Sequence, residues 1–432
     1  MPANPYKSLF KAEPPLHEVR VMDAPAGNTV RLGAEGGTAV RSLAARLFSG
    51  LIERIDAGLL HGRIEAILPG GRRRTLGGRG AGPVAIVELN RWRGLWRLAS
   101  DGSAGWYRAW ADGDWTSPDP VALFELFAAN SVALGDTGRA SGALRWARRA
   151  GHWLRRNSKR GSRRNIEFHY DLGNDFYDQW LDAGLTYSSA LFAPGDTLEA
   201  AQSRKLAAVL ERTGTRPGET ILEIGCGWGS FAEAAARGGR EVRGITLSTE
   251  QKRAVLSRMA RAGLSGVEVT LTDYRDVTGS FDAVASIEMV EAVGAEYWPD
   301  YLSTIARLLK PGGRAAIQFI SIDDAIFGGY ARNVDFIQAH IFPGGMLLSK
   351  ARFRALAAEY GLEWRDEHDF GLDYAETLKQ WRVRFDAAVE EGRLPAQFDR
   401  AFIGLWRYYL MYCEGGFRGR GINVSQVTLV KA

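Results

Sequence analysis

Apolar residues recur with two different periods along the chain, and the region from residue 165 onward combines both. Short apolar runs there are separated by segments whose apolar positions recur at helical spacing. Strands that alternate with helices predict an α/β fold, a parallel sheet with helices on both faces. The expected strands are 220–224, 242–246, 267–271, 281–286 and 314–320, and the expected helices are 198–213, 231–237, 249–262 and 297–309.

The alternation stops after residue 320, where a segment rich in glycine and aromatic residues follows. Residues 323–349 are too long for a simple connection between strands, so they predict a lid or inserted helices over a site. Helices at 350–360 and 374–389 and a closing strand at 423–430 complete the pattern.

The N-terminal region has a less regular pattern with many aromatic residues. It predicts a helix at 39–60, a hairpin-like piece at 68–82, strands at 84–89 and 95–98, a turn at 101–105 and a helix at 120–130. These elements indicate a small α+β domain, residues 31–140, with an aromatic core of its own. The proline-rich residues 1–30 are expected to be poorly ordered, 141–164 form a basic linker, and 165–432 form the second domain.

Three glycines at alternate positions, Gly225, Gly227 and Gly229, follow the strand at 220–224. Glycine lets the backbone pass close under a ligand, and open α/β sheets bind ligands at the carboxyl ends of their strands. A dinucleotide fold carries an acid at the end of the next strand, but this strand ends in Thr246-Leu247-Ser248. The turn therefore resembles that of S-adenosylmethionine (SAM) methyltransferases; the alternative is a glycine-rich turn that binds nothing.

Composition adds limits to this interpretation. An apolar content of 46% and a charged content of 24% fit a soluble globular protein with a full core. The sequence has no apolar run long enough to span a membrane, and the N-terminus, Met1-Pro-Ala-Asn-Pro5, lacks a charged-then-apolar signal pattern, which favours a cytoplasmic protein. Two cysteines and the histidine spacing predict neither a disulfide framework nor a metal site.

The net charge of +5 is modest, but its distribution is uneven. Nine arginines and lysines and no acid lie between Arg145 and Arg164, with Trp146 and Trp153 among them. Such a segment can lie on anionic phospholipid, contact nucleic-acid phosphates or serve as a solvated linker. The expected partner is a phospholipid bilayer surface, contacted peripherally at the inner membrane face, and not nucleic acid. The assembly state stays open, a homodimer included.

A set of ordered motifs carries a specific resemblance. The motifs are Glu223-Ile-Gly-Cys-Gly-Trp-Gly229, Thr246-Leu-Ser with Gln251, His169-Tyr-Asp-Leu-Gly-Asn174, Thr186-Tyr-Ser188, Val290-Glu-Ala-Val-Gly294, Ile341-Phe-Pro-Gly-Gly345, Asp373-Tyr374 and Cys413 with Phe417-Arg418. Together they resemble the cyclopropane-fatty-acyl-phospholipid synthases, whose core the mycolic acid methyltransferases share. The resemblance is close over residues 165–432, is looser before them, and implies a Rossmann-like SAM methyltransferase sheet with a helical lid.

The resemblance implies that SAM methylates a cis double bond inside a phospholipid acyl chain and that the ring then closes to a cyclopropane. It places SAM against a set of strand-end and turn residues: Tyr187, Ser188, Gly225, Gly227, Thr246, Leu247, Gln251, Asp273 and Tyr274. Aromatic faces would stabilise the cation that methylation leaves on the chain, and the nearby candidates are Phe168, Tyr170, Phe176 and Tyr374.

The resemblance further implies a bound bicarbonate ion as the base that removes a proton from the added methyl. Glu291 and Tyr374 match two of its ligands, while Ser189 and Gln318 replace a cysteine and a histidine. Serine and glutamine can donate hydrogen bonds to an anion but cannot carry its proton away. This departure opens a second outcome, a methyl-branched or methylene product without ring closure. Cys413 matches a cysteine once proposed as catalytic, although packing is the more ordinary role of a buried cysteine.

Two other functions remain open at this level. One is a methyltransferase for small molecules or nucleic acid, which the apolar segment 325–348 disfavours. The other is a lipid-binding protein with a degenerate methyltransferase half.

Overall fold

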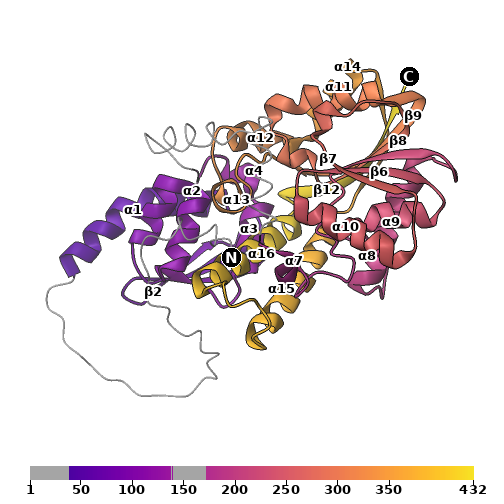
Figure 1. Cartoon of the computed structure of the whole chain (residues 1–432). Coiled ribbons are helices and arrows are strands. Elements are labelled where there is room, and N and C mark those ends of the chain that lie inside the picture. The colour runs from indigo at the N-terminus through magenta and orange to yellow at the C-terminus, as the bar shows by residue number, and fades with distance from the viewer. Residues whose placement is uncertain (1–37, 138, 140–171) are drawn as a thin grey trace.

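A large mixed sheet forms the centre of the C-terminal region (Figure 1). The computed structural model describes residues 38–137, 139 and 172–432. The sheet has eight strands in the order β11-β12-β9-β8-β5-β6-β7, with β10 paired to β9. Its strands are β5 (Thr220–Ile224), β6 (Glu241–Thr246), β7 (Val267–Leu271), β8 (Phe281–Ile287), β9 (Leu309–Ile322), β10 (Leu348–Ser349), β11 (Leu362–Asp369) and β12 (Ile422–Lys431).

The strand pairing brings the parallel strands' carboxyl ends to one edge. Strands β7, β6, β5, β8 and β9 pair in parallel, whereas β12 runs antiparallel to both β9 and β11. The α/β fold is confirmed, and each predicted strand of this region is present to within a few residues at its ends, except that β9 starts earlier than expected. Strand β11 was not predicted, because it is largely exposed and carries charged residues.

Helices cover both faces of the sheet because its buried side chains alternate. Leu222 and Ile224 pack in one apolar cluster with α11 (Trp298–Leu308) and α14 (Lys350–Glu359). Ile221 packs in another cluster with α8 (Leu198–Thr213) and α9 (Ser230–Arg237). Helix α10 (Thr249–Ala262) packs against β6 and β7.

The expected lid consists of two short helices, α12 (Asp324–Ala331) and α13 (Phe336–His340), followed by β10. Helices α15 (Gly371–Glu390) and α16 (Arg400–Arg418) then lie side by side, before β12 closes the sheet. The sequence pattern predicted α15 but missed α16. Short turns of helix complete the region: α7 (Asn174–Tyr177), η2 (Tyr274–Asp276), η3 (Val290–Ala292) and η4 (Ala295–Tyr297). No helix of the described residues is long and apolar enough to cross a membrane.

The N-terminal region has a four-stranded sheet in the order β2-β1-β3-β4. Its elements are α1 (Thr38–Gly58), β1 (Arg63–Leu68), β2 (Arg72–Gly77), β3 (Val84–Leu89), α2 (Arg93–Ala111), β4 (Trp115–Thr116), α3 (Pro120–Ala129) and α4 (Ser131–Leu134). The strand predicted at 95–98 is wrong, because Leu95 and Leu98 lie on the buried side of α2. The turn predicted at 101–105 is a kink inside the same helix, where Gly102 has φ 57° and ψ −143°.

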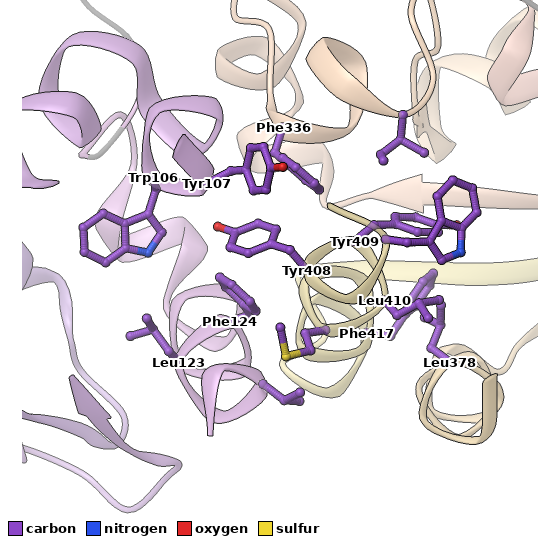
Figure 2. Close-up of a cluster of buried hydrophobic side chains, with 14 of the residues drawn as sticks. Trp106, Tyr107, Leu123, Phe124, Phe336, Leu378, Tyr408, Tyr409, Leu410 and Phe417 are labelled. Carbon is purple, nitrogen blue, oxygen red and sulfur yellow. The ribbon is translucent and has the colours of Figure 1, made fainter. Parts of the chain in front are cut away.

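The prediction that the N-terminal region has an aromatic core of its own is also wrong. Tyr107 of α2 packs on Phe336 of the lid and on Tyr408 of α16, with ring centroids 5.0 Å apart in each case. Phe124 of α3 contacts Tyr408 and Tyr412 at 5.2 and 5.3 Å. We define the aromatic junction as Tyr107, Phe124, Phe336, Tyr408 and Tyr412, and Figure 2 shows the first four of these residues. It belongs to one continuous core that runs from α1 to α16.

Close backbone contact reinforces the junction. A Cβ atom at Gly415 would lie 2.4 Å from Cβ of Phe124, and one at Gly419 would come closer still to the carbonyl oxygen of Glu125. These glycines let α16 approach α3 more closely than other residues would. The predicted segments 1–30 and 141–164 lie outside the described residues.

Candidate active site

One cavity of about 590 Å³ contains all nine residues that were predicted to contact SAM. Tyr187 and Ser188 come from the segment before α8, and Gly225 and Gly227 from the turn after β5. Thr246 and Leu247 come from the end of β6, and Gln251 from the first turn of the following helix α10. Asp273 and Tyr274 follow β7. Four segments thus converge where parallel strands end, the usual place for a ligand in this type of sheet.

The turn after β5 fits a ligand that approaches the backbone closely. Gly225 and Gly227 have φ angles of 84° and 50°, in the left-handed region that glycine enters without strain. A Cβ at Gly227 would meet nothing within 4 Å, so the space in front of this residue is open. The hydroxyl of Thr246 donates to the side-chain oxygen of Gln251 at 2.7 Å, which holds both polar groups at the cavity. These features fit SAM.

Deeper in the cavity, three hydrogen-bond donors converge on the carboxylate of Glu288. The backbone N–H of Ser189 and the amide of Gln318 donate to Oε1, at 2.9 and 2.8 Å. The hydroxyl of Tyr374 donates to Oε2 at 2.7 Å. Glu291 lies in the same cavity wall as Glu288 and Tyr374. We call Ser189, Glu288, Glu291, Gln318 and Tyr374 the carboxylate centre.

The backbone at Glu288 is strained in a way that points to function. Glu288 follows β8 with φ 50°, a left-handed conformation that a residue with a side chain adopts at a cost of about 1–3 kcal/mol. Its N–H donates to the carbonyl oxygen of Gln318 at 2.8 Å, so β9 holds this conformation. Glycine would adopt it freely. A carboxylate retained at such a position favours a role for the side chain itself.

Burial controls the charge of the carboxylate centre. Burial and, to a smaller extent, the nearby charge of Glu288 together raise the pKa of Glu291 to about 8. Burial also raises the pKa of Glu288, but the hydrogen bond from Tyr374 and the charge of Lys205 oppose this. We therefore assign the negative charge of the pair to Glu288 and a proton to Glu291 at neutral pH. One oxygen of Glu291 accepts from the N–H of Ile320, and the other has no partner among the described residues.

Lys205 supplies a buried positive charge near this pair. The side chain is fully buried in α8, and its ammonium donates to the hydroxyl of Ser188 at 2.5 Å. Burial lowers the pKa of the ammonium to about 8, although Glu288, Asp182 and Glu223 favour its charged form. The sequence analysis did not single out this lysine.

The predicted bicarbonate ligands are thus brought together, but around a carboxylate of the chain. Ser189 and Gln318 are fully buried behind Glu288 and do not line the cavity. The Ser189 hydroxyl donates to the carbonyl oxygen of Ala190. The donors proposed for bicarbonate are therefore engaged, and a further anion would meet the charge of Glu288. The set does not fit bicarbonate, and we derive no step through it.

The remaining predicted residues have different outcomes. Cys413 lines the cavity from α16 and packs against the core, and burial raises the pKa of its thiol, which disfavours a thiolate nucleophile. Tyr374 lines the cavity, whereas Phe176 is buried among Phe398, Phe402 and Trp406 and cannot face a substrate cation. Phe168 and Tyr170 lie outside the described residues.

Glu288 is the candidate site residue that sequence reasoning missed. A signal was present, because a carboxylate directly follows the buried strand β8 at the edge where ligands bind. The motif that begins at Val290 drew attention to Glu291 instead. Only the three-dimensional arrangement shows that Ser189, Gln318 and Tyr374 all donate to Glu288.

A Rossmann-like sheet with a glycine turn under an open cavity defines the class of SAM-dependent methyltransferases, and the comparisons agree. The family model described as mycolic acid cyclopropane synthetase matches residues 157–427. The chain belongs to this family, is a SAM-dependent methyltransferase and binds SAM.

Two relatives have names that describe different reactions. The chain is 36% identical over 356 residues to the tuberculostearic acid methyltransferase of Mycobacterium tuberculosis, covering 78% of this chain and 80% of the relative. It is 38% identical over 263 residues to the cyclopropane-fatty-acyl-phospholipid synthase of Escherichia coli, covering 60% of this chain and 65% of the relative.

A solved structure resembles the chain over the same region. The mycolic acid cyclopropane synthase CmaA1, in complex with SAH and CTAB, is 30% identical to it. The TM-score is 0.59, and the match covers 62% of this chain and 98% of that structure. The described N-terminal elements, α1 to α4, all precede the region that the family model matches.

Proposed function

We propose that the enzyme methylates the cis double bond of an unsaturated lipid acyl chain and that Glu288 removes the proton afterwards. The observation that carries this proposal is the carboxylate of Glu288, held by donors that the family resemblance assigns to bicarbonate. The names of the two relatives support a lipid substrate.

The cavity suits an apolar substrate. Beyond the predicted SAM contacts it is lined largely by apolar and aromatic side chains, among them Ile320, Ile337, Phe342, Leu378 and Phe417. Its volume of about 590 Å³ lies within the range of about 300–1,000 Å³ that ligand sites usually have. An alkene is a weak nucleophile, so a site that excludes water and holds the double bond in line favours the reaction.

The bonding changes assign a task to each group. SAM, when bound, supplies an electrophilic methyl group on sulfur. The π electrons of the alkene form the new C–C bond while the S–C bond breaks, which leaves a cation on the neighbouring chain carbon. The ring of Tyr374 and the carboxylate of Glu288 are placed in the cavity wall to stabilise this cation. Glu288 then accepts a proton, and the electron pair of the broken C–H bond neutralises the cation to give the product.

We infer that the product has no ring. Ring closure requires the base to take a proton from the added methyl as the second C–C bond forms. Loss of a proton from the chain instead leaves a methyl-branched alkene, and a hydride shift before proton loss from the methyl leaves a methylene group. Three hydrogen bonds fix the carboxylate of Glu288 in one position, whereas a free bicarbonate ion could move together with the cation. The 38% identity to the Escherichia coli synthase favours cyclopropane as the second candidate.

Proton NMR tests the product directly. The purified enzyme would be incubated with SAM and vesicles of dioleoyl phosphatidylglycerol, and the extracted lipid examined. We expect olefinic or methylene protons and no upfield cyclopropane methylene signals. Mass alone cannot decide, because all these products add the same atoms. Upfield cyclopropane signals would overturn the proposal that the product has no ring.

We also propose that the enzyme works peripherally at the inner membrane surface on phospholipid-bound chains, through the basic segment between Arg145 and Arg164. Exchange of its arginines for glutamine should weaken vesicle binding and activity on vesicles at unchanged SAM affinity. Unaltered activity on vesicles would contradict this role. Vesicle sedimentation and calorimetry with SAM measure the two quantities.

A further inference from the structure

The cavity extends beyond the carboxylate centre to the N-terminal helices. Its lining includes residues of all four N-terminal helices α1 to α4, among them Ile55, Leu98, Trp106, Phe127, Ser131 and Leu134. All six precede residue 157, where the match to the family model begins. The part of the cavity that they line is therefore formed by residues outside the matched region.

This end of the cavity is lined mainly by apolar side chains, with Ser103, Thr137 and Arg139 as polar neighbours, and the guanidinium of Arg139 pairs with Asp136. Ile55, Leu98, Trp106 and Leu134 are buried, each 9% exposed or less. The kink at Gly102, which also lines the cavity, sets the two halves of α2 in different directions beside it. A charged or zwitterionic head group would lose its hydration against such walls, whereas a hydrocarbon end would gain from burial.

We propose that the N-terminal helices hold the methyl-terminal part of the acyl chain and select its length beyond the double bond. This rests on the proposed function, because it places the double bond at Glu288 and the donor at the glycine turn. The carbons between the double bond and the methyl end then reach toward α2, α3 and α4. The distance from the carboxylate centre to these helices sets how many carbons fit.

Two substitutions change the volume of the N-terminal end of the cavity in opposite directions. Ser131→Phe adds a ring at a half-buried position of α4 that lines the cavity, and Phe127→Ala removes one from α3. Val132→Phe is the matched control, because Val132 adjoins Ser131 on α4 but is 56% exposed and does not line the cavity. SAM affinity, measured by calorimetry, reports whether each variant keeps its fold.

The experiment measures competition in mixed vesicles. Palmitoleoyl and oleoyl chains have the same distance from carbonyl to double bond, and oleoyl is two methylenes longer on the methyl side. Ser131→Phe should raise the ratio of palmitoleoyl to oleoyl product, by up to about tenfold, the effect that burial of two methylenes supports. Phe127→Ala should lower the ratio, and Val132→Phe should leave it unchanged.

A second pair of chains separates the two ends of the substrate. Palmitoleoyl and cis-vaccenoyl chains match on the methyl side and differ on the carbonyl side, so their ratio should not change. Continued methyl transfer with unchanged ratios in both variants would overturn the assignment of the N-terminal helices and leave the proposed function standing. A shift confined to the second pair would also overturn it. Absence of acyl methylation by the unmodified enzyme would instead refute the proposed function.

Discussion

The carboxylate centre and the aromatic junction lie in the same protein, but they are built on opposite principles. The first collects buried ionisable groups: the charged Glu288 and the protonated Glu291, with Lys205 close by. The second collects rings that pack at 4.8 to 6.3 Å between centroids, with close contact between helices. Burial of charge disfavours folding unless each group is paired, whereas burial of rings favours it.

The difference indicates that the two regions have different roles. The junction and its neighbouring helices supply packing, which holds α2, α3 and the lid helix α13 against α16 (Figure 2). The carboxylate centre carries the left-handed backbone of Glu288 and an oxygen of Glu291 without a partner. Such features are retained where chemistry requires them. Substitutions in the aromatic junction should change stability, and substitution of Glu288 should change activity.

The largest effect is expected at Glu288. Glu288→Gln keeps the size of the side chain but removes the base, so methyl transfer to vesicles should fall by about 10²–10⁴-fold. SAM affinity should stay within about twofold, because its predicted contacts are elsewhere in the cavity. Glu376→Gln, at a half-buried carboxylate paired with Lys379 on α15, is the control and should keep full activity. A Glu288→Gln enzyme with normal turnover would remove Glu288 from the mechanism.

The same contrast explains what the sequence could predict. The strands around β5 follow from the local spacing of hydrophobic residues, and the glycine turn follows from residues close together in the chain. Both could therefore be predicted. All nine predicted SAM contacts come from such local motifs and share one cavity. The chemistry of Glu288 depends on Ser189, Gln318 and Tyr374, which come from three other segments and meet only in the fold.

The junction was unpredictable for a related reason. Its rings come from α2, α3, the lid and α16, and no local period shows that they pack together. Helix α16 was itself missed, although its buried residues recur at helical spacing. The strand assigned to Leu95 and Leu98 shows the same limit, since a short apolar run fits either a strand or a kinked helix.

The second prediction concerns stability and pH at Glu291. Its pKa rises from the ordinary 4.5 to about 8 on folding, so between these values the folded state keeps a proton that the unfolded state has released. The free energy of unfolding should therefore fall as pH rises, by up to about 1.4 kcal/mol per pH unit. Glu288, whose pKa is also raised, acts in the same direction.

Glu291→Gln separates the two carboxylates. Denaturant unfolding between pH 5 and pH 7.5 should show a smaller decline in stability for this variant than for the unmodified protein. Glutamine keeps the acceptor for the N–H of Ile320, so the two proteins should be alike at pH 5. Lys205 does not interfere, because its lowered pKa of about 8 affects stability only above this range. Equal slopes would show that Glu291 is not held protonated.

The smallest effect is expected at the junction, and one helix offers both the test and its control. Gly415→Ala on α16 would place a Cβ against Phe124 and the backbone of Glu125, so stability should fall by about 1–3 kcal/mol. Gly404→Ala lies on the same helix, and its Cβ would meet only Trp110 at an ordinary 3.9 Å. This control should gain about 0.5–1 kcal/mol from the better helix former. Thermal unfolding of the two variants should therefore shift in opposite directions, and parallel shifts would mean that close packing of α3 on α16 is not what joins the two regions.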